Sequence, residues 1–273
     1  MTVHTHTDGN AASAIPMGKP LAGIRVLAVE NFIAGPFASM WLADAGAEVV
    51  KIETRGEGDY ARGTSPLRTD DNDVVRSLSF LRSNRNKKSL TLDLKHPEGK
   101  KVFEQLVAEA DVLLENLRPG AMDKLGLGWE AMREVNPRLV YVAISGFGHG
   151  DILPSPLSER PAFDVMAQAL AGLMNRPERE GDRPVYLGFS LADIQAGIVA
   201  AYGTMLALFQ RSTTGVGRKV DVSLYDASLA LNELAVVMYS ATRQVSKPGA
   251  HALSAPFGAY KASDGWITIA VLG

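Results

Sequence analysis

The chain has 273 residues, of which 46% are hydrophobic and 21% are charged, and its formal net charge is −2. This composition is typical of a globular protein that is large enough for one large core or two domains, and the small net charge argues against general nucleic-acid binding. The absence of cysteine excludes disulfides, thiol catalysis and cysteine-based metal sites, and it fits a cytoplasmic protein. No apolar run is expected to be long enough to span a membrane.

The first 19 residues are small and polar, and we predict a flexible tail there without a signal peptide. His4 and His6 fall in this tail, but their spacing alone does not indicate a metal site. We therefore expect no bound metal ion.

From residue 20 onward, buried strands alternate with helices. Strands are predicted at 23–29, 48–53, 89–94, 111–114 and 139–145, and helices at 36–45, 97–109, 119–125 and 129–135. The charged stretch 55–88 is predicted to be loop. Continuous apolar runs are typical of strands that are covered on both faces, so we predict a mostly parallel, Rossmann-like sheet. No G-x-G-x-x-G follows the first strand, which weakens a nicotinamide-dependent oxidoreductase interpretation.

The second half begins with a helix predicted at 163–174 and a long helix between Ser190 and Gly215. A strand at 219–223, a helix at 223–243 and two strands at 257–261 and 266–271, joined as a hairpin, follow. These elements predict a large domain at 20–222, a linking helix and linker at 223–255, and the start of a smaller domain at 256–273. Because a lone hairpin buries little, we expect further chain or a partner to cover this end.

Asp193 stands at the start of the predicted long helix, three residues after Ser190. The two residues fit the S-x-x-D form of a capping box, in which Asp193 would only stabilise the first helical turn. In a catalytic role, the helix N-terminus would keep the carboxylate ionised, and an ionised carboxylate can attack an activated acyl group. The local pattern leaves both roles open.

Basic side chains gather just before the strand predicted at 89–94. The cluster consists of Arg82, Arg85, Lys87 and Lys88, with Asn84 and Asn86 between them. It is either a solvated charged loop or a phosphate site that Arg55, Arg62 and Arg118 could extend. A ligand with several phosphates and a purine, such as an adenosine phosphate or coenzyme A, would fit it.

The glycine-rich loop 146–150 follows the strand predicted at 139–145 and contains His149. Ligands of open α/β sheets bind at the carboxyl ends of the strands, so His149 could contact a substrate, although a histidine in a loop is ordinary. No Ser-His-Asp set, G-x-S-x-G elbow, H-E-x-x-H or Walker loop is recognised.

Taken together, several segments resemble the class III coenzyme A transferases of the CaiB/BaiF type, over nearly the whole chain from about residue 20 onward. The matching segments are PLAGIRVL (20–27), AGP (34–36), DAGAEVVKIE (44–53), NKKSLTLDL (86–94), DVLLEN (111–116) with RPG (118–120), and LADIQAG (191–197) followed by GVGRKVD (215–221). Each is modest alone, but their order and spacing make the combination specific.

The resemblance implies an acyl-CoA:carboxylate CoA-transferase, with coenzyme A as a substrate and no tightly bound cofactor. It places the catalytic aspartate on Asp193, which would pass through a mixed anhydride and an aspartyl-CoA thioester. Together with the basic cluster, it gives these candidate CoA contacts: Phe32, Ile33, Ala34, Arg55, Arg85, Asn86, Lys87, Asn116, Leu117, Arg118 and Lys124. Weaker candidates for the substrate pocket are Phe163, Tyr186 and His149. The apolar Ile33 speaks against a formyl or oxalate specialist.

The expected partners are an acyl-CoA, a small carboxylic acid and a second copy of the chain, because family members form interlocked homodimers with each active site at a subunit junction. Neither nucleic acid nor membrane is expected. The chain breaks off as the family's smaller domain begins, and residues 247–249 (KPG) are the nearest candidate for the family's glycine-rich lid.

Two other functions are weighed. The same fold includes α-methylacyl-CoA racemases, which use a histidine and this same aspartate as an acid/base pair. Phe163 occupies the position of that histidine, and phenylalanine cannot transfer a proton, which favours the transferase. The third possibility is a CoA-binding fragment without catalysis.

Overall fold

The computed structural model describes residues 18–175, 183–245 and 256–271. Most of the expected flexible tail, with His4 and His6, and the candidate lid at 247–249 lie outside these residues. Six parallel strands form the central sheet in the order β5-β2-β1-β6-β7-β8. The strands are β1 (Arg25–Val29), β2 (Glu48–Glu53), β5 (Lys87–Thr91), β6 (Val112–Glu115), β7 (Val140–Ser145) and β8 (Lys219–Ser223). The prediction of a Rossmann-like parallel sheet is confirmed.

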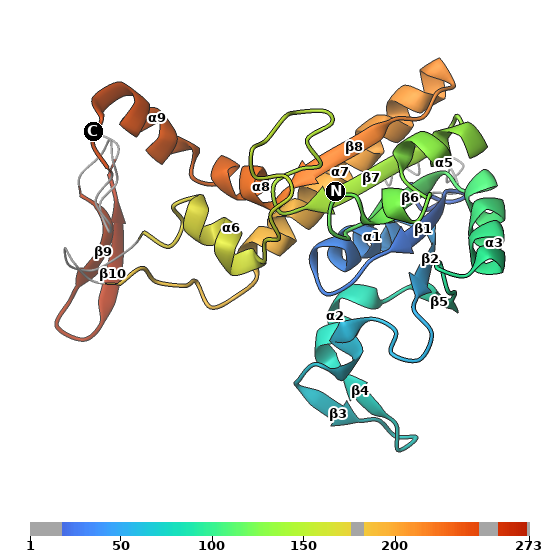
Figure 1. Cartoon of the computed structure of the whole chain (residues 1–273). Coiled ribbons are helices and arrows are strands. Elements are labelled where there is room, and N and C mark those ends of the chain that lie inside the picture. The colour runs from blue at the N-terminus through green and yellow to red at the C-terminus, as the bar shows by residue number, and fades with distance from the viewer. Residues whose placement is uncertain (1–17, 176–182, 246–255, 272–273) are drawn as a thin grey trace, which may run out of the picture.

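Helices cover both faces of this sheet (Figure 1). Side chains alternate along β1: Val26 and Ala28 join one core, and Leu27 and Val29 join the other. The first core contains residues of α1 (Ala34–Asp44) and α7 (Leu191–Thr214), and the second contains residues of α3 (Pro97–Ala108), α4 (Ala121–Lys124) and α5 (Trp129–Val135). Burial on both faces explains why these strands have continuous apolar sequences.

α7 contacts α1 closely because its buried residues, apart from Arg211 near its C-terminal end, are Ala, Gly and Thr. A Cβ atom on Gly197 would lie 3.0 Å from the carbonyl oxygen of Ala34 and 3.1 Å from Cδ1 of Phe37. By length and composition α7 could cross a membrane, so the expectation that no apolar run is long enough is wrong. Its contacts with α1, β7 and β8 give its apolar residues a place in the protein core.

The prediction of loop throughout 55–88 is wrong. This stretch holds the short helix η1 (Tyr60–Gly63), the hairpin of β3 (Leu67–Thr69) with β4 (Val75–Ser77), and α2 (Leu78–Asn84). Figure 1 shows the hairpin projecting from the body of the molecule. The Ser77 hydroxyl accepts a hydrogen bond from the N–H of Phe80 and so begins α2, a local contact that the abundant charges obscure.

The single helix predicted at 223–243 is two helices, α8 (Leu224–Ala230) and α9 (Glu233–Thr242). The break falls at Asn232, whose side-chain amide donates to the carbonyl oxygen of Ala171, one residue beyond α6 (Asp164–Leu170). α6 is shorter than predicted because Gly172 has a positive φ of 74°.

The predicted C-terminal hairpin is confirmed: β9 (Phe257–Lys261) pairs antiparallel with β10 (Trp266–Ala270). It lies apart from the six-stranded sheet in Figure 1, and α9 has no buried residue. The division into a large domain, a linker and the start of a smaller domain stays a prediction.

Candidate functional site

A pocket of about 410 Å³ opens at the carboxyl edge of the sheet. β1 and β6 are neighbours there, but the chain leaves them toward opposite sides of the sheet, which is the switch point where open α/β folds bind ligands. The pocket is lined by residues at the end of β7, by residues that follow β1, β6 and β7, and by the starts of α1, α6, α7 and α8. The lining set is Asn31, Phe32, Ile33, Ala34, Asn116, Leu117, Arg118, Pro119, Ile144, Ser145, Gly146, Arg160, Pro161, Ala162, Phe163, Asp164, Val165, Tyr186, Asp193 and Leu224.

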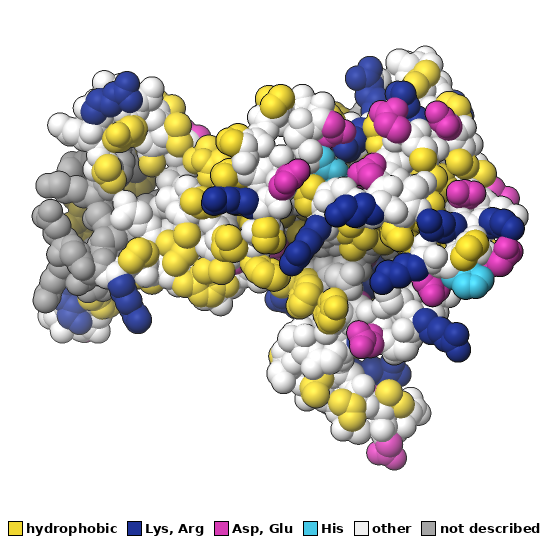
Figure 2. Space-filling model, in the orientation of Figure 1, with side chains coloured by type: hydrophobic (Ala, Val, Ile, Leu, Met, Phe, Trp, Pro, Cys, Tyr) yellow, Lys and Arg dark blue, Asp and Glu magenta, His cyan; other side chains and the backbone are white. Residues whose placement is uncertain are grey.

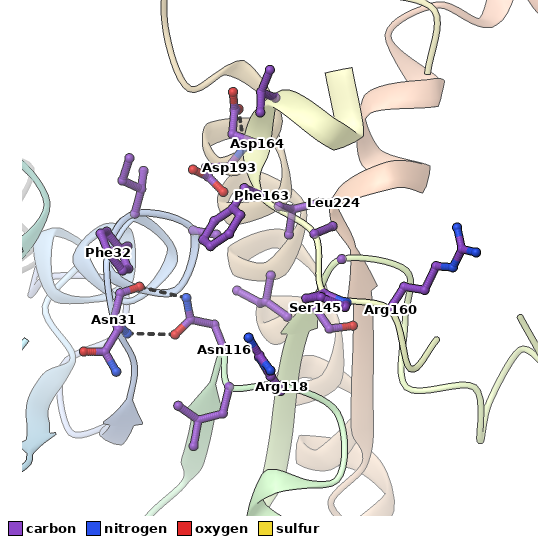
Figure 3. Close-up of a pocket in the computed structure, with 18 of the residues that line it drawn as sticks. Asn31, Phe32, Asn116, Arg118, Ser145, Arg160, Phe163, Asp164, Asp193 and Leu224 are labelled. Atoms are coloured by element: carbon purple, nitrogen blue, oxygen red, sulfur yellow. Dashed lines mark hydrogen bonds between the residues drawn. The ribbon is translucent and has the colours of Figure 1, made fainter. Parts of the chain in front are cut away.

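Two asparagines join the loops that follow β1 and β6. The N–H of Asn31 donates to Oδ1 of Asn116 at 2.8 Å, and Nδ2 of Asn116 donates to the carbonyl oxygen of Asn31 at 2.9 Å (Figure 3). The next residue, Phe32, has a left-handed φ of 64°, and its N–H donates to Asp59 at 3.1 Å. Side-chain hydrogen bonds therefore connect the two loops that form this wall of the pocket.

A buried cluster of charged side chains lies next to this wall. Glu30 lies 2.8 Å from the ammonium of Lys87 and 3.4 Å from that of Lys51, which also lies 2.8 Å from Asp59. Burial alone would raise the pKa of Glu30, but the two ammonium groups outweigh it and hold that pKa below its usual range. Burial lowers the pKa of Lys87 to about 8, although Glu30 opposes this.

Asp193 lies in the first turn of α7, where it lines the pocket. The predicted capping box is wrong, because the Ser190 side chain makes no cap hydrogen bond. Instead Asp164, which comes from α6, accepts from the N–H groups of Ala192 at 2.7 Å and Asp193 at 3.3 Å. No hydrogen bond to the Asp193 carboxylate itself is found within the described part of the chain.

Burial raises the pKa of Asp193 to about 7, the negative charge of Asp164 adds to the rise, and Arg82 opposes it. The expectation that the helix N-terminus keeps this carboxylate ionised is therefore corrected, because burial raises its pKa into the neutral range. In Figure 3 Phe163 lies beside Asp193, with Phe32 on the other side of the pocket.

The structure brings nine of the predicted site residues to this pocket: Phe32, Ile33, Ala34, Asn116, Leu117, Arg118, Phe163, Tyr186 and Asp193. The other predicted residues do not line it. Arg85 and Asn86 bind the carboxylate of Asp44, and Lys87 is in the buried cluster. Arg55 and Lys124 are exposed. Of the basic cluster, Arg82 alone has no ion-pair partner among the described residues.

His149 faces a second hollow, of about 360 Å³, which Tyr141, Asp151 and Lys219 also line. Its Nε2 lies 3.4 Å from Glu115, and burial followed by the charge of Lys219 lowers its pKa. Burial raises the pKa of Glu115 to about 8, and this side chain accepts from the N–H of Leu117 at 2.7 Å. His149 therefore does not line the main pocket, although Pro119 lines both this hollow and the pocket.

Sequence reasoning did not identify Asn31, Ser145, Arg160 or Asp164 as pocket residues. Position at or just after the carboxyl end of a buried strand was an available signal for Ser145, the last residue of β7, and for Asn31, because such residues share the carboxyl edge of the sheet. For Asp164 no local signal exists, since the N–H groups that it binds are 28 and 29 residues away in sequence. Among the described residues no group of three or more potential metal ligands is found.

A family model described as CoA-transferase family III matches residues 21–273. The beta subunit of succinyl-CoA–L-malate CoA-transferase from Chloroflexus aurantiacus is 38% identical over 257 residues, which cover 92% of this chain and 61% of that protein. Succinyl-CoA:glutarate CoA-transferase from Homo sapiens is 36% identical, with coverage of 92% and 56%. The crystal structure of a CaiB/BaiF family protein from Brucella suis matches with a TM-score of 0.83 and 34% identity, over 92% of this chain and 66% of that one. The chain therefore spans less than two thirds of the length of each.

Proposed function

The chain belongs to CoA-transferase family III, and from this premise we propose that the protein moves coenzyme A between short organic acids, with Asp193 as the nucleophile. The observation that carries the proposal is the position of Asp193. It is a carboxylate at a helix N-terminus, in a pocket at the switch point of the sheet, beside loops that the family resemblance assigns to CoA.

The proposed reaction balances in four steps. The Asp193 carboxylate attacks the carbonyl carbon of the donor thioester and releases CoA thiolate, which leaves an acyl-aspartyl anhydride. The thiolate then attacks the aspartyl carbonyl, so that the donor acid departs and an aspartyl-CoA thioester forms. The acceptor carboxylate expels the thiolate again, and the thiolate takes the new acyl group and restores Asp193. Splitting one difficult exchange into covalent steps lowers each barrier, and no proton is consumed.

The setting of Asp193 supports this chemistry. A pKa of about 7 leaves a substantial ionised fraction at neutral pH and makes that fraction more basic than an ordinary carboxylate. The N-terminus of α1 has no side-chain cap, and Ile33 and Ala34 at this end line the pocket. Its free N–H groups and helix dipole are suited to a thiolate or an anhydride oxyanion.

The substrates proposed are an acyl-CoA and a short carboxylic acid. The relatives are named for succinyl-CoA with malate or glutarate, and one from Acetobacter aceti is named for acetyl-CoA with oxalate. Ile33 leaves the pocket apolar where formyl or oxalate specialists are expected to be polar. CoA enters as a substrate, so the chemistry needs no tightly bound cofactor. We propose that the protein acts in the cytoplasm.

We also propose that the working unit is an interlocked homodimer. Figure 2 shows hydrophobic side chains gathered over α6 and the 183–190 loop, beside the pocket. The exposed apolar residues there are Phe163, Val165, Met166, Leu170, Val185, Tyr186, Leu187 and Phe189. α9 adds Val236, Val237 and Tyr239, which are also exposed. Surfaces of this kind mark interfaces between proteins, and a second copy would close the mouth of the pocket.

A racemase would need a second acid/base group opposite Asp193. No histidine lines the pocket within the described residues, and Phe163 lies beside Asp193 instead. Solvent deuterium should therefore not enter the α-carbon of a 2-methylacyl-CoA.

The test incubates the protein with short acyl-CoAs in deuterated buffer, traps with hydroxylamine or borohydride, and maps the modified peptide by mass spectrometry. Modification confined to the Asp193 peptide, lost in Asp193→Asn while CoA still binds, is the expected result. Full turnover by Asp193→Asn would reject the nucleophile. CoA binding without any adduct would favour a non-catalytic CoA-binding role, and deuterium incorporation would favour the racemase.

A further inference from the structure

Asp164 accepts four hydrogen bonds, and two of them come from the helical turn that carries Asp193. Its Oδ1 accepts from the N–H groups of Ala192 and Asp193, at 2.7 and 3.3 Å. Its Oδ2 accepts from Nε2 of Gln168 at 2.6 Å and from the hydroxyl of Tyr186 at 3.4 Å. Every partner is a donor, which is the environment that an ionised carboxylate requires.

The two hydrogen bonds from Ala192 and Asp193 take the place of the N-cap hydrogen bond that Ser190 does not make. The first N–H groups of a helix have no partner within the helix, and a side chain at the N-cap usually accepts from them. Ser190 occupies the N-cap of α7 without making such a bond. Asp164, on the first turn of α6, performs the capping from a separate helix, and it is only 8% exposed.

We propose that Asp164 is a positioning residue for Asp193: it fixes the first turn of α7 through its hydrogen bonds and places a buried negative charge beside the Asp193 carboxylate. The proposal rests on the proposed function of Asp193.

The electrostatic part follows from the charges around Asp193. Asp164 on α6 raises the pKa of Asp193, after desolvation, and Arg82 on α2 lowers it. Among the described residues that line the pocket, Tyr186 in the loop before α7 and the guanidinium groups of Arg118 and Arg160 are further titratable groups, and the first turn of α1 carries no acidic residue. The four donors around Asp164 suit a negatively charged carboxylate, and a negative charge close to the poorly solvated Asp193 disfavours a second one there, which raises the pKa of Asp193.

Three variants separate the charge of Asp164 from its structural role. Asp164→Asn removes the charge but keeps an oxygen that can accept from the α7 N–H groups. Asp164→Glu restores the charge on a longer side chain. Gln168→Met keeps Asp164 charged but removes the amide that donates to Asp164 and to the carbonyl oxygen of Phe189, at 2.6 and 2.9 Å. It is the matched control for disturbance of this network.

The first measurement is an NMR titration of the Asp193 side-chain carboxyl in the full chain, assigned with Asp193→Asn. The second is the pH dependence of kcat/KM for CoA transfer. We expect Asp164→Asn to move the titration midpoint and the acid limb of kcat/KM to lower pH, by on the order of one pH unit. Asp164→Glu should return both toward the wild-type values, and Gln168→Met should move neither, although it melts at a lower temperature.

An unchanged midpoint in Asp164→Asn would overturn the proposal and leave Asp164 as a cap only. Equal shifts in Asp164→Asn and Gln168→Met would also overturn it, because structural disturbance would then explain the effect. The titration needs no turnover, so it is decided separately from the proposed function. If Asp193→Asn retains activity, the proposed function fails, whereas the electrostatic coupling between the two carboxylates is still measured.

Discussion

Asn31 and Asn116 form two hydrogen bonds with each other just beyond the carboxyl ends of β1 and β6, and these bonds connect the two loops that form the pocket wall. We expect Asn116→Ala to raise the KM for acyl-CoA more than it lowers kcat, because it loosens this wall and leaves the chemistry of Asp193 in place. The free energy of unfolding should fall by about 1–3 kcal/mol, since two backbone groups lose their partner.

Asn136 offers a matched control. Its amide donates to the carbonyl oxygens of Val107 and Ala110, at 3.0 and 2.8 Å, away from the pocket. Asn136→Ala should cost similar stability without changing the KM. An equal rise of KM in both variants would show that general loosening, and not the pocket wall, is responsible.

The pKa of Asp193 gives a prediction on stability against pH. In the folded protein the pKa is about 7, above its ordinary 3.8, so the folded state holds this proton more tightly than the unfolded state. The ionised carboxylate therefore destabilises the folded state. The free energy of unfolding of Asp193→Asn should increase relative to that of the wild type as pH rises from about 4 to about 7. Above that range the gain should reach at most about 4 kcal/mol, measured by urea denaturation. Asp71→Asn, at an exposed site, should show no such trend, and a gain that is independent of pH would contradict the raised pKa.

The buried pair of Glu30 and Lys87 should behave as a unit. Lys87→Met removes one of the two ammonium groups that face Glu30 and is expected to cost about 3 kcal/mol, because a buried carboxylate loses compensation. The double variant Glu30→Gln with Lys87→Met should recover part of this loss. A double-mutant cycle in urea measures the coupling, and simple additivity of the two single changes would show that the pair does not interact.

Gly217 is predicted to be intolerant of any side chain. A Cβ atom there would lie 1.9 Å from the carbonyl oxygen of Leu139, the residue before β7. The backbone would therefore have to move to make room for the added atom. Gly217→Ala should cost about 2 kcal/mol or more of folding free energy in thermal unfolding. Gly265→Ala, where nothing lies within 4 Å of the added atom, is the control and should leave the melting temperature nearly unchanged.

The sequence was sufficient for the parallel sheet because burial on both faces makes β1, β6 and β7 continuously apolar, and that pattern is local. The helix break at Asn232 and the cap by Asp164 could not be predicted in this way, because both depend on contacts between segments far apart in the chain. The same reason applies to the basic cluster: its charges suggested phosphate binding, but Lys87 is neutralised by Glu30, 57 residues away. The local hydrophobic pattern therefore predicted which strands end at the site, whereas contacts between distant segments determine which side chains line it.

Buried side-chain contacts hold α7 at both ends: Asp164 of α6 binds its first turn, and its own Arg211 binds residues outside the helix. At its C-terminal end Arg211 binds the Asp111 carboxylate at 2.8 Å and the carbonyl oxygen of Arg138 at 3.2 Å, at the amino edge of the sheet. Its 24 residues make a rod of about 36 Å with Asp193 at the far tip. A helix that is fixed at both ends resists sliding and rotation, so the position of Asp193 depends on contacts at the opposite edge of the sheet. Removing the Arg211 contacts would let the proposed nucleophile move although no residue of the pocket is changed.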